Sequence, residues 1–144
     1  MVGPANRPGM LIRNSRMTFV PYFSYQDAAA ALDWLEQAFG FERSQDYRDD
    51  AGGVVHAELT FGGGSIMLGT GNPPGGDPAP SETSPTGHGV YVVVDDVDAH
   101  YQQARALGAV VVYPPEETEF GTRRYRALDV EGYEWSFGTY RPSA

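Results

Sequence analysis

The spacing of apolar positions changes along the first half of the chain from a strand period to a helix period. Residues 17–25 alternate in character, which predicts a strand. Apolar residues then recur at helical spacing from Ala28 to Ala38, which predicts an amphipathic helix with one buried stripe. Asp27 is placed to accept hydrogen bonds as the N-cap, and Gly40 is placed to end the helix as the C-cap. Three further strands are predicted, at 41–47, 54–61 and 65–69.

A segment rich in proline and glycine separates this unit from a second one. Residues 71–86 contain five prolines, a density that no helix or central strand tolerates, so they are predicted to be a linker. A strand at 89–94 follows, then the capping residue Asp96, a helix over 97–107 and Gly108 at its end. Three more strands are predicted at 109–113, 122–128 and 133–138, with a loop over 114–121.

The two halves are related by a constant shift of 69 positions. Adding 69 takes Asp27 to Asp96, Gly63 to Gly132 and Gly69 to Gly138. We therefore interpret the chain as two copies of a βαβββ unit, with an α+β fold in one compact domain. The predicted chain consists of an N-terminal tail (1–16), a first module (17–70), a linker (71–86) and a second module (87–140).

Composition narrows the classes of protein and partner. The formal net charge of −9 argues against a nucleic-acid partner, which needs a basic surface. There is no cysteine, and therefore no disulfide framework or thiolate site. No apolar run is long enough to cross a membrane, and the first residues do not resemble a secretory signal. We therefore expect a cytoplasmic protein without nucleic-acid or membrane partners.

Three segments resemble the vicinal oxygen chelate superfamily, which includes glyoxalase I, bleomycin-resistance proteins and extradiol dioxygenases. They are the two strand-then-helix openings, Tyr22–Phe41 and Val90–Ala109, and the closing segment Asp129–Gly138. The closing segment is also similar to the PhnB-like, glyoxalase-like bacterial branch. The resemblance covers roughly 17–140. It implies two tandem modules forming a curved sheet that encloses a cleft, and it implies a homodimer.

The resemblance also implies where metal ligands stand in metal-dependent members. Those four positions hold residues without a carboxylate or imidazole: Val20, Met67, Gly89 and Ser136. Such a set does not bind a divalent cation, so we predict no metal and no cofactor. His88 adjoins Gly89, but a slip of one residue turns a strand side chain to the opposite face.

Strand parity predicts which side chains line the cleft and would bind a ligand: Tyr22, His56, Glu58, Met67, Tyr91, Tyr125, Glu134 and Ser136. Arg123 shares the parity of Tyr125. His56 and Glu58 are the candidates for acid–base chemistry, although a strand face exposed to water has the same pattern. The tyrosines suit stacking on a planar ligand and equally suit a core. Trp135 is predicted to be core, and His100 a solvated surface residue.

Two functions remain open, with a third that no residue favours. The first is a small-molecule binding protein that holds an aromatic or heteroaromatic ligand in the cleft without metal. The alternative is a glyoxalase-type lyase or isomerase, or a dioxygenase, which uses either no metal or a displaced metal site built from His56, Glu58 and Glu134. The third is a scaffold for protein interaction that uses the linker. The missing metal ligands favour the first function, and whether the protein is an enzyme is left open.

Overall fold

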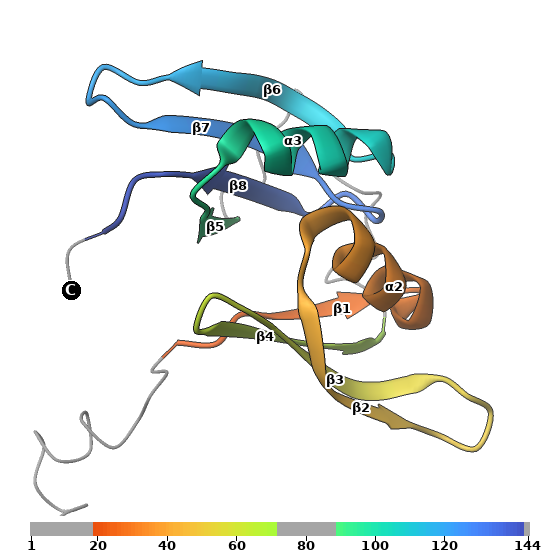
Figure 1. Cartoon of the computed structure of the whole chain (residues 1–144). Coiled ribbons are helices and arrows are strands. Elements are labelled where there is room, and N and C mark those ends of the chain that lie inside the picture. Colours follow the sequence, from red (N-terminus) through yellow and green to blue (C-terminus); the bar gives the residue numbers. More distant parts are fainter. Residues whose placement is uncertain (1–18, 72–88, 143–144) are drawn as a thin grey trace, which may run out of the picture.

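The computed structural model describes residues 19–71 and 89–142. The predicted tail, most of the predicted linker and His88 lie outside the described residues. The first module contains β1 (Tyr22–Tyr25), α2 (Ala28–Phe39), β2 (Glu42–Arg48), β3 (Val54–Phe61) and β4 (Gly64–Thr70). The second contains β5 (Val90–Val93), α3 (Val97–Ala106), β6 (Val110–Glu117), β7 (Arg123–Leu128) and β8 (Glu134–Gly138) (Figure 1). The predicted α+β fold with two βαβββ modules is confirmed.

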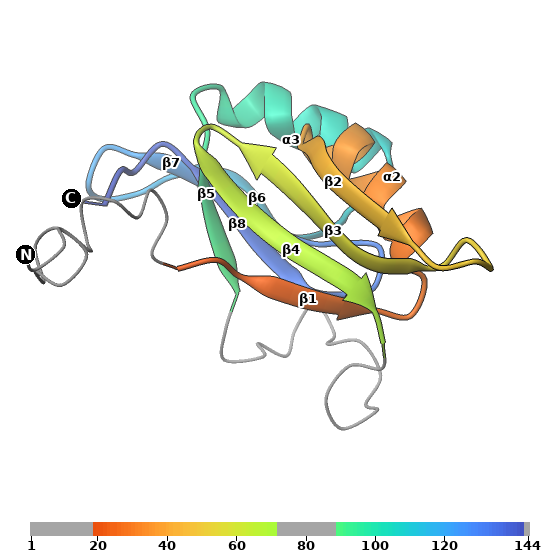
Figure 2. The same ribbon diagram turned by 90° about the horizontal axis from the view of Figure 1, so that it is seen from below.

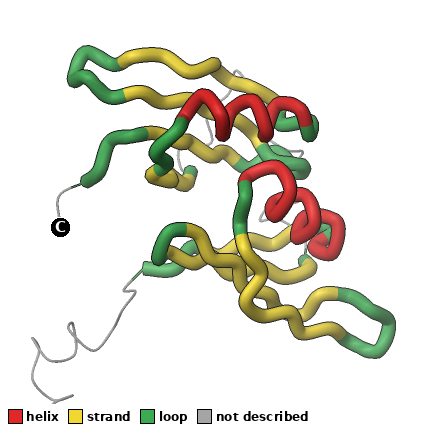
Figure 3. Tube along the Cα trace, in the orientation of Figure 1, coloured by secondary structure: helices red, strands yellow, loops and turns green. Residues whose placement is uncertain are grey.

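Each module has its own four-stranded mixed sheet. The strand orders are β1-β4-β3-β2 and β5-β8-β7-β6, and the first pair in each order is parallel while the others are antiparallel. The tube view shows the two sheets as separate layers, each with its own helix (Figure 3). Phe23 pairs with Leu68 and Val92 pairs with Phe137, so both parallel pairs obey the shift of 69.

Both helices begin where the sequence predicts and end within one residue of the predicted end. The Asp27 carboxylate accepts from the backbone N–H of Ala30 at 3.0 Å, and Asp96 does the same for Ala99 at 3.0 Å. Gly40 adopts a left-handed conformation, with φ of 81°, which favours glycine. These local signals fix the two helices, which lie side by side in the folded chain (Figure 2). No helix among the described residues is long and apolar enough to cross a membrane.

One predicted loop is in fact strand. β6 continues to Glu117, through the two prolines of the segment predicted as a loop over 114–121. β6 is the outermost strand of its sheet, where proline is tolerated because one side of the strand has no partner. The register is also irregular there, since Tyr113 pairs with Arg126 and Glu116 with Arg124. The bulge accommodates the prolines without ending the strand.

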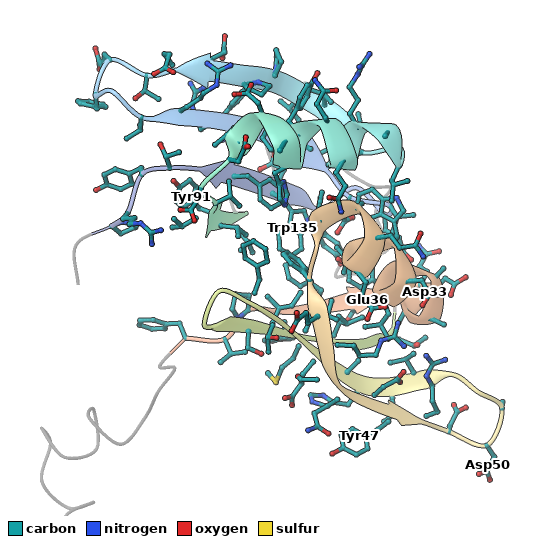
Figure 4. The ribbon with its side chains drawn as sticks, viewed as in Figure 1. Asp33, Glu36, Tyr47, Asp50, Tyr91 and Trp135 are labelled. Atoms are coloured by element: carbon teal, nitrogen blue, oxygen red, sulfur yellow. The ribbon has the colours of Figure 1, made fainter. Side chains whose placement is uncertain are left out.

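The helix-facing sides of the two sheets share one hydrophobic core. Trp135 of β8 is fully buried and stacks on Phe23 of β1 at a centroid distance of 5.2 Å. It also packs against Phe39 and Phe41, at 5.5 and 5.4 Å. Figure 4 shows Trp135 between the modules, close to α2. Since these faces meet in the core, the opposite faces of both sheets point away from it.

The loop between β7 and β8 fastens the second module to the first. Buried Asp129 accepts from the Tyr25 hydroxyl at 2.5 Å and from Trp135 Nε1 at 2.9 Å. Burial raises the pKa of Asp129, and the four hydrogen bonds that it accepts oppose that rise. Glu131 accepts from the backbone N–H groups of Gln26 and Asp27 at 2.8 and 2.9 Å. These contacts hold the β1–α2 junction against the second module.

Candidate functional site

The sheet faces that point away from the helices each carry a row of side chains across all four strands. In the first module the row is Tyr22, Met67, Glu58 and Gln45, which are consecutive partners in the strand register. In the second module it is Tyr91, Ser136, Arg126 and Tyr113. We name these the first row and the second row. Glu58 and Arg126 occupy equivalent places in the two rows.

The first row carries a histidine–carboxylate pair. His56 Nε2 lies 2.8 Å from Glu58 Oε2, and both side chains are about one-third exposed. Tyr47 flanks the pair, since its ring centroid is 6.1 Å from that of His56 and its hydroxyl donates to Gln45 Oε1 at 2.9 Å. Figure 4 shows Tyr47 on the side of β2 and β3 away from α2. A carboxylate bonded to one imidazole nitrogen orients the ring and supports proton transfer or hydrogen bonding at this face.

The second row carries a guanidinium instead. Arg126 Nε donates to Ser136 Oγ at 3.3 Å, and the Arg126 Cζ lies 5.4 Å from the centroid of the Tyr113 ring. Arg124 Cζ lies 4.4 Å from the same centroid, so two cations share one aromatic ring. Tyr91 closes the other end of the row, and its hydroxyl donates to the Tyr140 carbonyl at 2.7 Å. Burial raises the pKa of Tyr91, which keeps it a neutral donor.

Tyr125 and Arg123 are not on this face, contrary to the prediction. Tyr125 pairs with Phe137 and is fully buried on the helix side, and burial raises the pKa of its hydroxyl. Arg123 reaches the helix side as well, where its guanidinium pairs with Asp98 at 2.9 Å. The prediction applied the shift of 69 to β7. In the structure, Ala57 pairs with Leu68, and Tyr125 pairs with Phe137 at the equivalent place. Ala57 of β3 therefore corresponds to Tyr125 of β7, which is a shift of 68.

One extra residue in the turn between β7 and β8 causes this difference in register. Four residues separate the paired positions Thr60 and Ser65, whereas five separate Leu128 and Glu134. A slip of one residue moves every side chain of a strand to the other face. Arg126 therefore lies where Tyr125 was expected. A comparison of the lengths of the two turns in the sequence would have predicted the reversed faces of β7.

His100 is another residue whose environment differs from the prediction. It is half-buried, with Nε2 donating to the Phe39 carbonyl at 2.8 Å and Nδ1 accepting from the Tyr125 hydroxyl at 2.6 Å. A carbonyl can only accept, so it fixes the proton on Nε2. Burial lowers the pKa of His100, and the ring is a structural link between α3, α2 and β7.

The four positions that the resemblance assigns to metal ligands do not fit a metal here. Met67 offers a thioether and Ser136 a hydroxyl, and neither Val20 nor Gly89 has a ligating side-chain atom. Glu134 Oε2 comes within 3.5 Å of the place where a Cβ on Gly89 would lie, and Glu58 is the cross-strand partner of Met67, so a carboxylate adjoins each of these two positions. In residues 19–71 and 89–142, no three His, Asp or Glu side chains gather as ligands. The displaced set of His56, Glu58 and Glu134 is thus not assembled within one chain.

A hollow of about 840 Å³ lies between the modules on the helix side. Of the predicted ligand-binding residues only Tyr91 reaches it. His100 and Gln103 border it, but each already donates to a backbone carbonyl, at 2.8 and 2.6 Å. Its other walls are mainly core aromatic and aliphatic side chains, such as Phe39, Val92 and Trp135. The two rows, with their polar groups on open faces, are therefore the better candidate site.

The fold defines a class of protein, in which two βαβββ modules each present an open sheet face away from the shared core. Residues 22–137 match the Glyoxalase/Bleomycin resistance protein/Dioxygenase superfamily, and the chain belongs to this family.

The chain is also similar to individual proteins. The uncharacterized protein Mb0911c of Mycobacterium bovis is 31% identical over 121 residues, which cover 82% of this chain and 80% of that protein. TioX from Micromonospora sp. ML1 is 30% identical, with a TM-score of 0.67 over 89% of this chain and 99% of that one. The fosfomycin resistance protein FosX from Listeria monocytogenes is 14% identical, with a TM-score of 0.64 over 85% of this chain and 91% of that one, and supports the fold alone.

Proposed function

We propose that the protein binds a small aromatic or heteroaromatic molecule without the family metal, and that it belongs to the PhnB-like branch. The observation that carries the proposal is the set of residues at the family's metal positions: Val20, Met67, Gly89 and Ser136. None of these side chains replaces a His or Glu ligand, so the chemistry that needs a chelated cation has no support at this place.

The remaining groups suit binding. Tyr22 and Tyr91 occupy the same place in the two rows, and Tyr22 is 77% exposed, so its ring is available for stacking. Met67 adds a polarizable apolar surface, while Ser136 adds a hydroxyl. An aromatic platform with a few polar groups is the usual lining of a small-molecule site.

The cleft is proposed to form between two chains. Within one chain the two rows point away from the shared core, so neither row covers the other. In a twofold dimer, the first row of one protomer would face the second row of its partner, which gives two identical clefts. The His56–Glu58 pair and Arg126 would then lie on opposite walls, with complementary charges.

Metal analysis and ligand screening test this function together. The purified protein is offered Ni²⁺, Zn²⁺, Mn²⁺ and Fe²⁺, dialysed, and examined by elemental analysis, and light scattering gives the mass in solution. We expect a dimer with no stoichiometric metal, and thermal stabilisation by planar aromatic compounds. Tyr91→Ala should abolish that stabilisation, whereas His56→Ala should reduce it less. A tightly held ion per chain would refute the proposal.

The alternative is a metal-independent lyase or isomerase, and one contact favours it. The 2.8 Å pairing of His56 with Glu58 is the arrangement that a general base requires. Turnover of glyoxalase-type substrates that disappears in His56→Ala, with ligand binding intact, would establish this alternative over sequestration.

A further inference from the structure

The guanidinium of Arg126 has an unusual environment for a half-buried cation. Its Nε donates to the Ser136 hydroxyl at 3.3 Å, and its terminal nitrogens have no hydrogen-bond acceptor among the described residues. The neighbouring arginines of β7 are paired, Arg123 with Asp98 at 2.9 Å and Arg124 with Glu116 at 3.3 Å. Removing a guanidinium partly from water without a counter-charge is unfavourable, so Arg126 favours an anion from outside the chain.

Nearby carboxylates do not supply that charge. Glu134 is two residues from Ser136 on the same face, but its carboxylate lies beside Gly89, the residue before β5. Glu116 pairs with Arg124 instead. Glu58, which would lie on the opposite wall of the proposed cleft, is already bonded to His56 at 2.8 Å. The second row thus keeps a cation in a chain whose net charge is −9.

The surroundings of Arg126 orient its donors. The Tyr113 ring, 5.4 Å from Cζ, holds the guanidinium by a cation–π contact. Ser136 accepts from Nε, so its own hydroxyl hydrogen remains available to donate. The terminal N–H groups and this hydroxyl can therefore donate to a single anion, and a guanidinium suits the planar, two-oxygen geometry of a carboxylate.

We propose that Arg126 and Ser136 form an anion subsite. The ligand of this protein is then an aromatic acid, whose carboxylate binds Arg126 and whose ring lies on the tyrosines of the second row. This inference rests on the proposed function and narrows it from aromatic compounds to aromatic acids.

A matched pair of probes tests the subsite, 2-naphthoate and 2-naphthamide, which differ in charge and share one ring system. Each is titrated into the ¹⁵N-labelled full-length protein, and the Nε–Hε signal of Arg126 and the backbone amides are followed by NMR. We expect naphthoate to shift the Arg126 signal and to bind about tenfold more tightly than naphthamide, since a charge-assisted pair is roughly twice as strong as a neutral one.

Two variants on the same strand supply the control. Arg126→Gln should remove the preference for naphthoate, whereas Arg123→Gln should keep it, because Arg123 lies on the helix side with Asp98. Amide spectra and thermal unfolding verify that both variants are folded.

The outcomes separate the two proposals. Equal affinity for the two probes, or a preference that persists in Arg126→Gln, would overturn the anion subsite while leaving aromatic binding intact. If neither probe shifts any signal of either row up to its solubility limit, both the subsite and the proposed function fail.

Discussion

The two modules have the same backbone plan and different chemistry at equivalent places. On the outward faces, Glu58 of the first module corresponds to Arg126 of the second. On the helix side, Ile66 corresponds to Trp135. The second module therefore supplies the bulky residue of the common core and the basic wall of the proposed cleft, while the first supplies the acidic wall. A repeated unit fixes backbone register, whereas its side chains are free to diverge on both faces.

The largest expected effect is a loss of stability that differs between equivalent core positions of the two modules. Trp135→Ala should lower the free energy of unfolding by about 3–5 kcal/mol, because it empties the space between the modules and removes a donor to Asp129. Ile66→Ala, at the matching position, should cost about 2–3 kcal/mol, at the low end for deleting an aliphatic core side chain. Chemical denaturation measures both. Equal losses would mean that the core is not centred on Trp135.

A second difference between the modules lies in the helices. His100 of α3 corresponds to Ala31 of α2, and only the histidine bridges the modules. His100→Ala should cost about 2–3 kcal/mol at pH 7, because the buried Tyr125 hydroxyl and the Phe39 carbonyl each lose a partner. His56→Ala, on the outward face beside the first row, is the control and should change the free energy of unfolding by less than about 1 kcal/mol.

The same residue predicts a pH dependence. Burial lowers the pKa of His100 from its usual value of 6.5, so the unfolded chain takes up the proton first as the pH falls. The stability that neutral His100 contributes is complete above that value and declines as the pH falls through it. The difference between wild type and His100→Ala should therefore shrink from pH 7 to pH 5. A difference that stays constant across this range would contradict the assignment.

Gly69 and Gly138 occupy equivalent positions in the two modules, so substitutions there compare how closely each backbone is packed. A Cβ on Gly138 would lie 2.8 Å from the Tyr91 hydroxyl and 3.0 Å from the Arg123 carbonyl, and one on Gly69 would lie 2.7 Å from the Val55 carbonyl. Either alanine substitution should cost about 1–3 kcal/mol through overpacking. Tyr91→Phe should restore part of the loss in Gly138→Ala. Tyr22→Phe should restore nothing in Gly69→Ala, because its obstacle is backbone. Rescue of both, or of neither, would contradict this geometry.

A feature could be predicted from the sequence when the residues that determine it are close together along the chain. Both helices were predicted because Asp27, Gly40 and Asp96 act on neighbours a few residues away. Tyr91 and Ser136 of the second row were predicted from strand parity, whereas Arg126 was missed because one extra residue in a turn reversed the faces of β7. The end of β6 was missed because its prolines predicted a loop. The role of His100 could not be predicted, since its partners are 61 and 25 residues distant.

The smallest expected effect concerns the two rows themselves. Glu58→Gln and Arg126→Gln should each change the free energy of unfolding by no more than about 0.5–1 kcal/mol, since a partly exposed pair contributes little and Arg126 has no carboxylate partner among the described residues. Denaturation by urea measures this, with Trp135→Ala as the sensitive reference. A loss above about 1.5 kcal/mol in either variant would make that charge part of the fold. Near-neutral stability would mean that the opposite charges of Glu58 and Arg126 contribute little to folding, as the proposed role in ligand binding requires.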